Sequence, residues 1–126
     1  MRWSFTNDRP IYLQIVEQLQ LAIVAGELAP GGRMSPVRDL AIEAAVNPNT
    51  MQKALSELER SELIYTQRTN GRFITEDTQK IEQLRHDLAR EHLLEFIGKM
   101  QQLGYSLGKI TEVLNEIVEE EKRNDK

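Results

Sequence analysis

Hydrophobic residues recur at helical spacing in the first part of the chain. The stretch "DRPIYLQIVEQLQLAIVAGEL" predicts an amphipathic helix, because its apolar residues repeat every three or four positions. Pro10 lies near the start of this helix and Gly26 beyond its end, which is the usual asymmetry of helix ends. The apolar face consists of Ile11, Ile15, Leu19, Ala22 and Ile23.

Two further helices are predicted after the turn "APGGRM". In "SPVRDLAIEAA", we expect Ser35 to cap a short helix whose first position is Pro36. In "NPNTMQKALSELER", Asn47 is the expected cap and Pro48 the first helical residue. The third helix then carries a stripe with i, i+3, i+4, i+7 spacing, formed by Met51, Ala54, Leu55 and Leu58.

The hydrophobic period then changes from helical to alternating. The stretch "LIYTQRTNGRFIT" predicts two strands around a loop containing Asn70 and Gly71, the pair that accepts positive φ most readily. Three short helices followed by a hairpin predict a winged helix-turn-helix domain over residues 1–75. The expected fold class is therefore mostly α with a small β-hairpin.

Helical spacing returns at about residue 77 and continues to the C-terminal region. Gly104 fits the end of one helix, Ser106 is the natural cap of the next, and Tyr105 can pack onto Ile110. We expect residues 76–126 to form a hairpin of two amphipathic helices, which cannot bury both apolar stripes by itself. The stripes are Ile81, Leu84, Leu88, His92, Phe96, Met100 and Leu103, and Ile110, Val113, Leu114, Ile117 and Val118.

The net charge of −4 is unevenly distributed along the chain. Residues 1–75 contain eight basic and eight acidic residues, whereas residues 76–126 contain eight basic and twelve acidic residues. The predicted N-terminal domain is thus neutral, and it can still bind nucleic acid if its cations converge on one face.

Composition also excludes several classes of protein. The chain has no cysteine, which rules out disulfides and thiolate metal sites. The opening "MRWSFTNDRP" contains no apolar run of signal-peptide length, and no later stretch could span a bilayer. We therefore interpret the chain as cytoplasmic, without a membrane partner.

The outward side of the third helix carries the candidate chemistry. Asn and Gln can pair with adenine, Thr with a base edge or thymine methyl, and Lys with guanine or phosphate. A recognition helix places such residues at its N-terminal end, and carboxylates are absent here until Glu57. The alternative is an ordinary solvated helix start. The outward residues are Asn49, Thr50, Gln52 and Lys53.

Three arginines could add contacts to the DNA backbone. Arg38 lies opposite the apolar side of the second helix, where it could bind phosphate or pair with Asp39 or Glu43. Arg68 and Arg72 flank the hairpin loop, which suits minor-groove or phosphate contact. An exposed hairpin kept soluble by its arginines is the alternative.

The sequence lacks the residue patterns that are typical of enzyme active sites. His86 and His92 are six residues apart, so they lie on opposite sides of a helix and cannot share a metal ion. His92 is expected to be buried or to lie in an interface. No nucleophile–base pair or phosphate-binding glycine loop is present, so we expect neither a catalytic site nor a cofactor nor a metal.

These motifs together resemble the GntR family of bacterial transcription regulators. "PIYLQIVEQLQLAIVAGELAPGGRM" is similar to the family's first helix and "G-x-L-x-P-G" turn, and "SPVRDLA" to "P-S-x-R-x-L-A". "VNPNTMQKALSELE" is similar to "V-x-x-x-T-V-x-x-A-L-x-x-L", and "LIYTQRTNGRFI" to the family's wing. The resemblance covers residues 9–75 and implies DNA contacts by Arg38, Asn49, Thr50, Gln52, Lys53, and Gly71 with its neighbours.

The chain departs from the family pattern at three positions. The usual Pro-Ser order is inverted to Ser35-Pro36, which puts the serine's phosphate contact in doubt. Ala45 replaces a glycine, and we expect strain of roughly 1 kcal/mol at a positive-φ turn position. Arg72 stands where a small residue is common.

The C-terminal helices are similar to those of the YtrA-type subgroup, whose members dimerise through them and whose genes commonly lie beside ABC transporters. We therefore expect a homodimeric repressor of a palindromic operator in double-stranded DNA. The alternative functions are a winged-helix protein-interaction module and a small enzyme, of which the enzyme is the less favoured. An effector could bind near Phe96, His92, Met100 and Tyr105. The expected DNA-binding residues are Arg38, Asn47, Asn49, Thr50, Gln52, Lys53, Arg68, Asn70, Gly71 and Arg72, and the expected dimer core is Leu88, Phe96, Ile110, Leu114 and Ile117.

Overall fold

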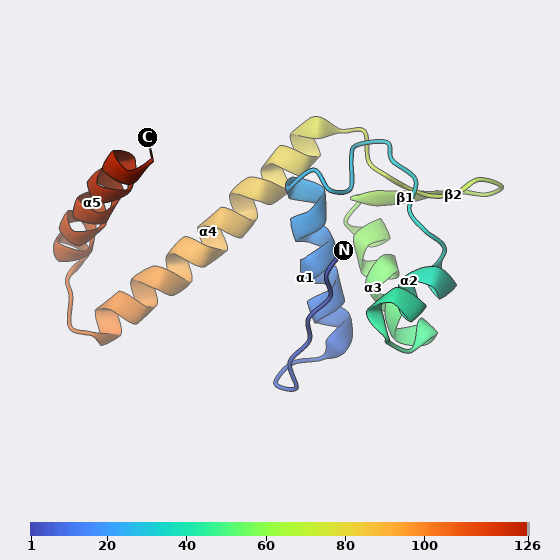
Figure 1. Ribbon diagram of the computed structural model, residues 1–126, viewed down its shortest axis with the longest axis horizontal. Coiled ribbons are helices and arrows are strands. Elements are labelled where there is room, and N and C mark those ends of the chain that lie inside the picture. Colours follow the sequence, from blue (N-terminus) through green and yellow to red (C-terminus); the bar gives the residue numbers. More distant parts are fainter. Residues whose placement is uncertain (126) are drawn as a thin grey trace. The chain divides into compact units, whose positions relative to one another are not determined.

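The predicted helices and hairpin are all present in the computed structural model, which describes residues 1–125 (Figure 1). The mostly helical winged helix-turn-helix class is therefore confirmed. In chain order the elements are α1 (Ile11–Val24), α2 (Val37–Ala44), α3 (Pro48–Arg60), β1 (Ile64–Gln67), β2 (Gly71–Ile74), α4 (Thr78–Gln102) and α5 (Leu107–Asn124).

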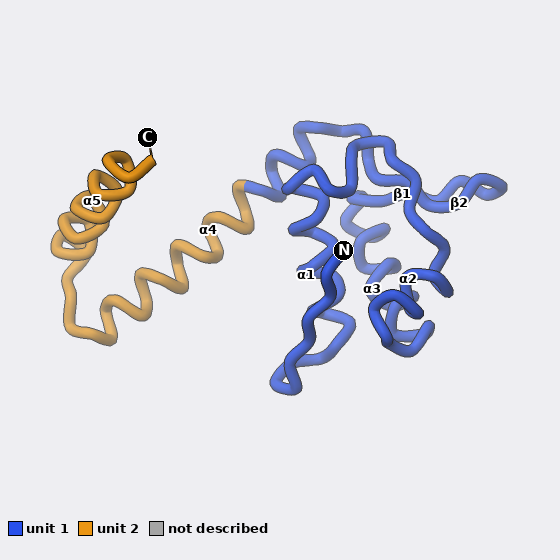
Figure 2. The backbone as a smooth tube through the Cα atoms, in the orientation of Figure 1, with its two compact units in different colours: residues 1–85 blue, residues 86–126 orange. Residues whose placement is uncertain are grey.

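The first compact unit comprises residues 1–85 and holds the main hydrophobic core (Figure 2). The predicted apolar faces of α1, α2 and α3 meet in this core, and both strands contribute one buried isoleucine each. The largest side chains with almost no exposed surface are Ile15, Leu19, Ile23, Met51, Leu55, Leu58, Ile64 and Ile74. This packing fixes the orientation of α3, so its opposite side must face outward.

The ends of α2 and α3 differ in how well the sequence predicted them. The Asn47 side chain accepts a hydrogen bond from the Asn49 amide at 2.7 Å, so the predicted cap of α3 is confirmed. The predicted Ser35 cap is wrong, because Pro36 occupies the N-cap position and α2 begins at Val37 without a side-chain cap. The residue before a proline is held in an extended conformation, which removes Ser35 from the helix start.

Ala45 ends α2 in the left-handed conformation, with φ 56° and ψ 45°. The expected positive φ at this position is therefore confirmed. An alanine Cβ crowds the following carbonyl in this conformation, which costs about 1 kcal/mol relative to glycine.

The hairpin pairs Gln67 with Gly71 at its tip and encloses a three-residue loop. Only Gly71 of the Asn70-Gly71 pair has a positive φ, at 98°, so the expectation for Asn70 is corrected. A third segment joins the sheet, because Arg33 bridges to Phe73 and the Met34 amide donates to the Arg72 carbonyl at 2.9 Å.

The first turns of α4 belong to the first unit. Ile81 and Leu84 pack against its core, and the Arg85 guanidinium donates to the Val24 carbonyl at the end of α1 at 2.6 Å. The compact unit thus extends to residue 85, whereas the sequence division between residues 75 and 76 follows the change of motif.

The second unit comprises residues 86–126 and contains the rest of α4 together with α5. The predicted Ser106 cap is confirmed, because its hydroxyl accepts from the Lys109 amide at 3.2 Å. A short turn joins the two helices, and they leave many large apolar side chains exposed. These are Leu93, Leu94, Leu103, Tyr105, Leu107, Leu114, Ile117 and Val118.

Candidate nucleic-acid interface

The N-terminal half of α3 presents neutral and basic side chains on its outer side. Asn49, Gln52 and Lys53 are exposed and Thr50 is half-buried, because Met51, Ala54 and Leu55 occupy the core side. The first turn contains no acidic residue. A helix N-terminus with free amides attracts phosphate, and no carboxylate opposes that attraction here.

Lys53 is held in place by an aromatic ring of the neighbouring helix. Its Nζ lies 3.9 Å from the centre of the Tyr12 ring, a cation–π contact between α3 and α1. The contact leaves Lys53 exposed while limiting the directions in which its long side chain can point. A cation with fewer accessible rotamers loses less entropy when it binds an anion.

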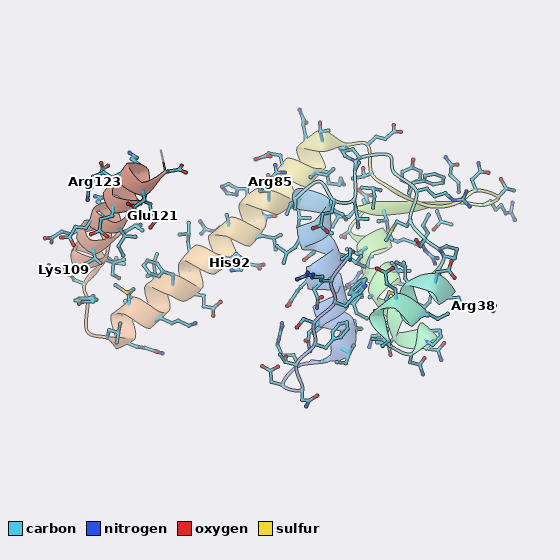
Figure 3. All side chains as sticks on the ribbon, in the orientation of Figure 1. Arg38, Arg85, His92, Lys109, Glu121 and Arg123 are labelled. Carbon is cyan, nitrogen blue, oxygen red and sulfur yellow. The ribbon has the colours of Figure 1, made fainter. Side chains whose placement is uncertain are left out.

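Arg38 lies on the exposed side of α2 (Figure 3). Within residues 1–125 its guanidinium makes neither a hydrogen bond nor an ion pair, so the suggested pairing with Asp39 or Glu43 does not form. Glu43 instead accepts from the N-terminal ammonium group of Met1 at 3.4 Å. Arg38 is thus a cation whose charge is available to an external anion.

The wing is the β1–β2 hairpin with its loop, and its two arginines, Arg68 and Arg72, differ in orientation. Arg68 is exposed in the loop, as are Thr69 and Asn70. Arg72 instead turns toward α3, where its Nε donates to Glu59 Oε1 at 2.8 Å and its Nη2 donates to Gln52 Oε1 at 3.2 Å. The sequence predicted a pair of free loop cations, but within residues 1–125 only Arg68 is without a partner, whereas Arg72 contacts α3.

Glu59 is the acidic partner that holds Arg72. Its Oε1 also accepts from the Thr66 hydroxyl at 2.8 Å. Burial raises the pKa of this carboxyl, but the hydrogen bonds from Arg72 and Thr66 and the charge of Arg72 outweigh burial, so its pKa lies below the ordinary value. Glu59 is consequently ionised at neutral pH, and its charge is compensated locally.

Arg33 lies beside the hairpin, whereas the sequence predicts only a simple turn for this segment. Its bridge to Phe73 brings the Arg33 side chain beside the wing, where a Cβ built on Gly71 would lie 3.5 Å from Arg33 Nε. Arg33 is exposed and adds a basic group next to Gly71. Only the long-range pairing with β2 reveals this position, and local sequence patterns carry no signal for it.

The remaining candidate groups form no second site in the described part of the chain. His86 and His92 are both exposed. The expected burial of His92 (labelled in Figure 3) within its own unit is therefore corrected, while an interface role stays a prediction. Residues 1–125 contain no group of three or more His, Cys, Asp or Glu side chains arranged to hold a metal. None of the described helices combines the length and apolar character that a bilayer crossing requires.

Comparisons with known proteins agree with this geometry. The family model "Bacterial regulatory proteins, gntR family" matches residues 11–74, which span α1 to β2. The uncharacterised HTH-type transcriptional regulator YhcF of Bacillus subtilis is 38% identical over 92% of this chain and 96% of its own. The HTH-type transcriptional repressor YtrA of the same organism is 35% identical over 94% of this chain and 95% of its own.

A solved structure extends the similarity beyond the family model. A GntR family transcriptional regulator from Listeria monocytogenes has a TM-score of 0.82 and 41% identity, covering 89% of this chain and 98% of its own. The relatives are named as transcriptional regulators, and the outward side of α3 carries amide, hydroxyl and amine side chains of the types that can pair with base edges. The chain therefore belongs to the GntR family of bacterial regulatory proteins and is a transcriptional regulator with a winged helix-turn-helix DNA-binding domain.

Proposed function

We propose that the protein is a homodimeric repressor that binds a palindromic operator in double-stranded DNA. The observation that carries the proposal is the outward side of α3, which is exposed, free of carboxylates in its first turn and flanked by Arg38, which has no ion-pair partner within residues 1–125. The name of YtrA, a transcriptional repressor at 35% identity over nearly the whole chain, supports repression.

In this proposal α3 enters the major groove, α2 crosses the backbone and the wing lies beside the phosphates. The N-terminal residues of a recognition helix reach base edges in this arrangement. Arg72 belongs to the surface through its contact with Gln52. The proposed DNA-binding residues are Arg38, Asn47, Asn49, Thr50, Gln52, Lys53, Arg68, Asn70, Gly71 and Arg72.

We assign dimerisation to the helical region after the wing, residues 76–126. Leu114 and Ile117 are 37% and 49% exposed, which is costly for large apolar side chains unless a second copy covers them. Leu88 and Phe96 are half-buried. Ile110 is only 4% exposed, so little of its side chain remains for a second copy to cover.

Two-fold symmetry links the dimer to the form of the operator. Two identical recognition helices read two identical half-sites in inverted order, centred about 34 Å or a multiple apart. The residues that face the partner and those that face DNA are then separate, because the first group lies on α4 and α5 and the second on α2, α3 and the wing. Regulation of a transporter operon and an effector bound between the dimer helices stay hypotheses.

A mobility shift with duplex fragments of the organism's own DNA, at about 50 and 200 mM salt, tests the proposal. A protein that contacts six to ten phosphates is expected to lose about 10³-fold or more in affinity across that range. A shift that is specific for some fragments and falls steeply with salt supports operator binding. No shift at the lower salt would favour the rival, a winged-helix module that binds another protein through the same surface.

A further inference from the structure

Gln52 is held by partners on both sides of its amide. Its Oε1 accepts from Arg72 Nη2 at 3.2 Å, and its Nε2 donates to Ser56 Oγ at 3.2 Å. Arg72 offers only donors, so the oxygen of the amide must face it and the nitrogen must face away. The contact from the wing therefore determines which way the Gln52 amide points.

Arg72 is itself fixed by the far end of the same helix. Glu59 lies seven residues after Gln52, so the two occupy the same side of α3 two turns apart. The Arg72 guanidinium spans this interval, with Nε on Glu59 and Nη2 on Gln52. Its side chain is only 20% exposed, which is low for an arginine at the edge of a hairpin. This chain of contacts, Glu59–Arg72–Gln52, is called the wing–helix relay below.

The relay leaves Gln52 able to read a base. The amide oxygen has a second lone pair and the amide nitrogen a second hydrogen after their contacts with Arg72 and Ser56. One acceptor and one donor side by side match the N6 and N7 edge of adenine in the major groove. An amide oriented in advance also loses less rotamer entropy on binding.

We propose that Arg72 is a positioning residue that determines base specificity through Gln52, rather than a phosphate contact of the wing. The proposal rests on the proposed function, in which α3 enters the major groove. It distinguishes Arg72 from Arg68, whose guanidinium is exposed in the loop and stands free to bind phosphate. The two arginines of one hairpin thus have different tasks.

The test begins with duplexes that the wild-type protein selects from a random library. Each base pair of one half-site is replaced in turn, and the affinity of every duplex is measured for the wild type and for Gln52→Ala. The base pair at which Gln52→Ala loses discrimination is the one that Gln52 reads. We then expect Arg72→Met to lose discrimination about 5- to 100-fold at that same base pair, and little elsewhere.

Arg68→Met is the matched control, since it removes the same charge from the same hairpin. It is expected to weaken all duplexes by one common factor and to reduce the salt slope by about one per protomer. Arg72→Met is expected to leave that slope unchanged. In the double variant with Gln52→Ala, the Arg72→Met change should add no further loss at the shared base pair.

Two results would overturn the relay. One is a uniform loss with a reduced salt slope for Arg72→Met, which would make Arg72 a phosphate contact. The other is a loss at a different base pair, which would make it a direct reader. If circular dichroism shows Arg72→Met to be unfolded, Glu59→Gln decides the same question, because it weakens the anchor of Arg72 and should reduce discrimination at the same position. A wild type that selects no duplex would overturn the proposed function itself.

Discussion

The ammonium group of Lys53 lies 3.9 Å from the centre of the Tyr12 ring. This contact joins the recognition helix α3 to α1, and it places a cation at a defined position on the outward surface. The ring attracts the cation weakly, by about 0.5–1 kcal/mol at an exposed site, so Lys53 can still contact a phosphate or a base. The ammonium group of Lys53 is therefore restricted in position and still accessible to an anionic partner.

Lys53→Glu is expected to abolish operator binding, because it places a carboxylate next to DNA at the N-terminal half of α3. The free energy of unfolding should fall by no more than about 1 kcal/mol, since the residue is exposed and loses only the ring contact. Fluorescence anisotropy with labelled operator and a denaturant titration measure the two effects.

Lys99→Glu is the control for that charge reversal, because it lies on α4 in the second unit and is 72% exposed. Its operator affinity should stay near that of the wild type. Binding by Lys53→Glu at wild-type strength would contradict the proposed placement of α3.

Ala45→Gly is expected to stabilise the protein by about 0.5–1 kcal/mol, because glycine adopts the left-handed conformation at the end of α2 without steric cost. Ala25→Gly is the matched control. Ala25 also ends a helix, but its φ is −79°, so glycine there gains nothing and increases the entropy of the unfolded chain. Thermal unfolding followed by circular dichroism measures both; an equal change in the two variants would refute the strain at Ala45.

Asn47 and Asn49 are expected to respond in opposite ways to alanine substitution. Asn47→Ala removes the cap of α3 and should cost about 1 kcal/mol of stability. Asn49→Ala removes an exposed side chain that makes no hydrogen bond within residues 1–125, so stability should change by less than about 0.5 kcal/mol while operator affinity falls. Urea unfolding and anisotropy separate the roles, and unchanged affinity for Asn49→Ala would remove it from the interface.

The ion pair of Glu59 with Arg72 is expected to make stability depend on pH in the acidic range. The pKa of Glu59 is lower in the folded chain than its ordinary value of 4.5, so its contribution is fully present above that pH. The contribution is lost as the pH falls through the folded-state pKa. The ion pair with Lys80 also lowers the pKa of Glu62. This pair is present both in the wild type and in the Glu59→Gln variant, so it does not contribute to the difference between them.

Glu59→Gln should therefore be less stable than the wild type near pH 7, by a few tenths of a kcal/mol because the pair is partly exposed. This difference should shrink toward zero at low pH. Urea titrations of both proteins between pH 7 and pH 3 measure it. A difference that stays constant over this range would show that Glu59 stabilises the fold by something other than its charge.

Local patterns were sufficient where the structure is determined by neighbouring residues. The apolar stripe of α3 and its Asn47 cap lie within one stretch of the chain, so the periodicity and the capping preference agreed with the structure. The positive φ of Ala45 was expected from the resemblance to a family that has glycine there, and it is present.

Long-range contacts explain what the sequence did not predict. The segment before α2 pairs with β2, which places Arg33 and Met34 beside the hairpin. The same hairpin places Arg72 over α3, where Glu59 attracts it away from the loop. These positions depend on contacts between residues that lie 13 to 40 positions apart in the sequence. The periodicity of hydrophobic residues along the chain does not predict such contacts.

Selection of duplexes from a random library by the purified wild-type protein shows whether two copies of the chain read an inverted repeat. We expect enrichment of an inverted repeat whose half-sites are centred about 34 Å or a multiple apart, bound by two copies of the 14.5 kDa chain. Enrichment of a single unpaired site bound by one chain, or of no sequence at low salt, would contradict it.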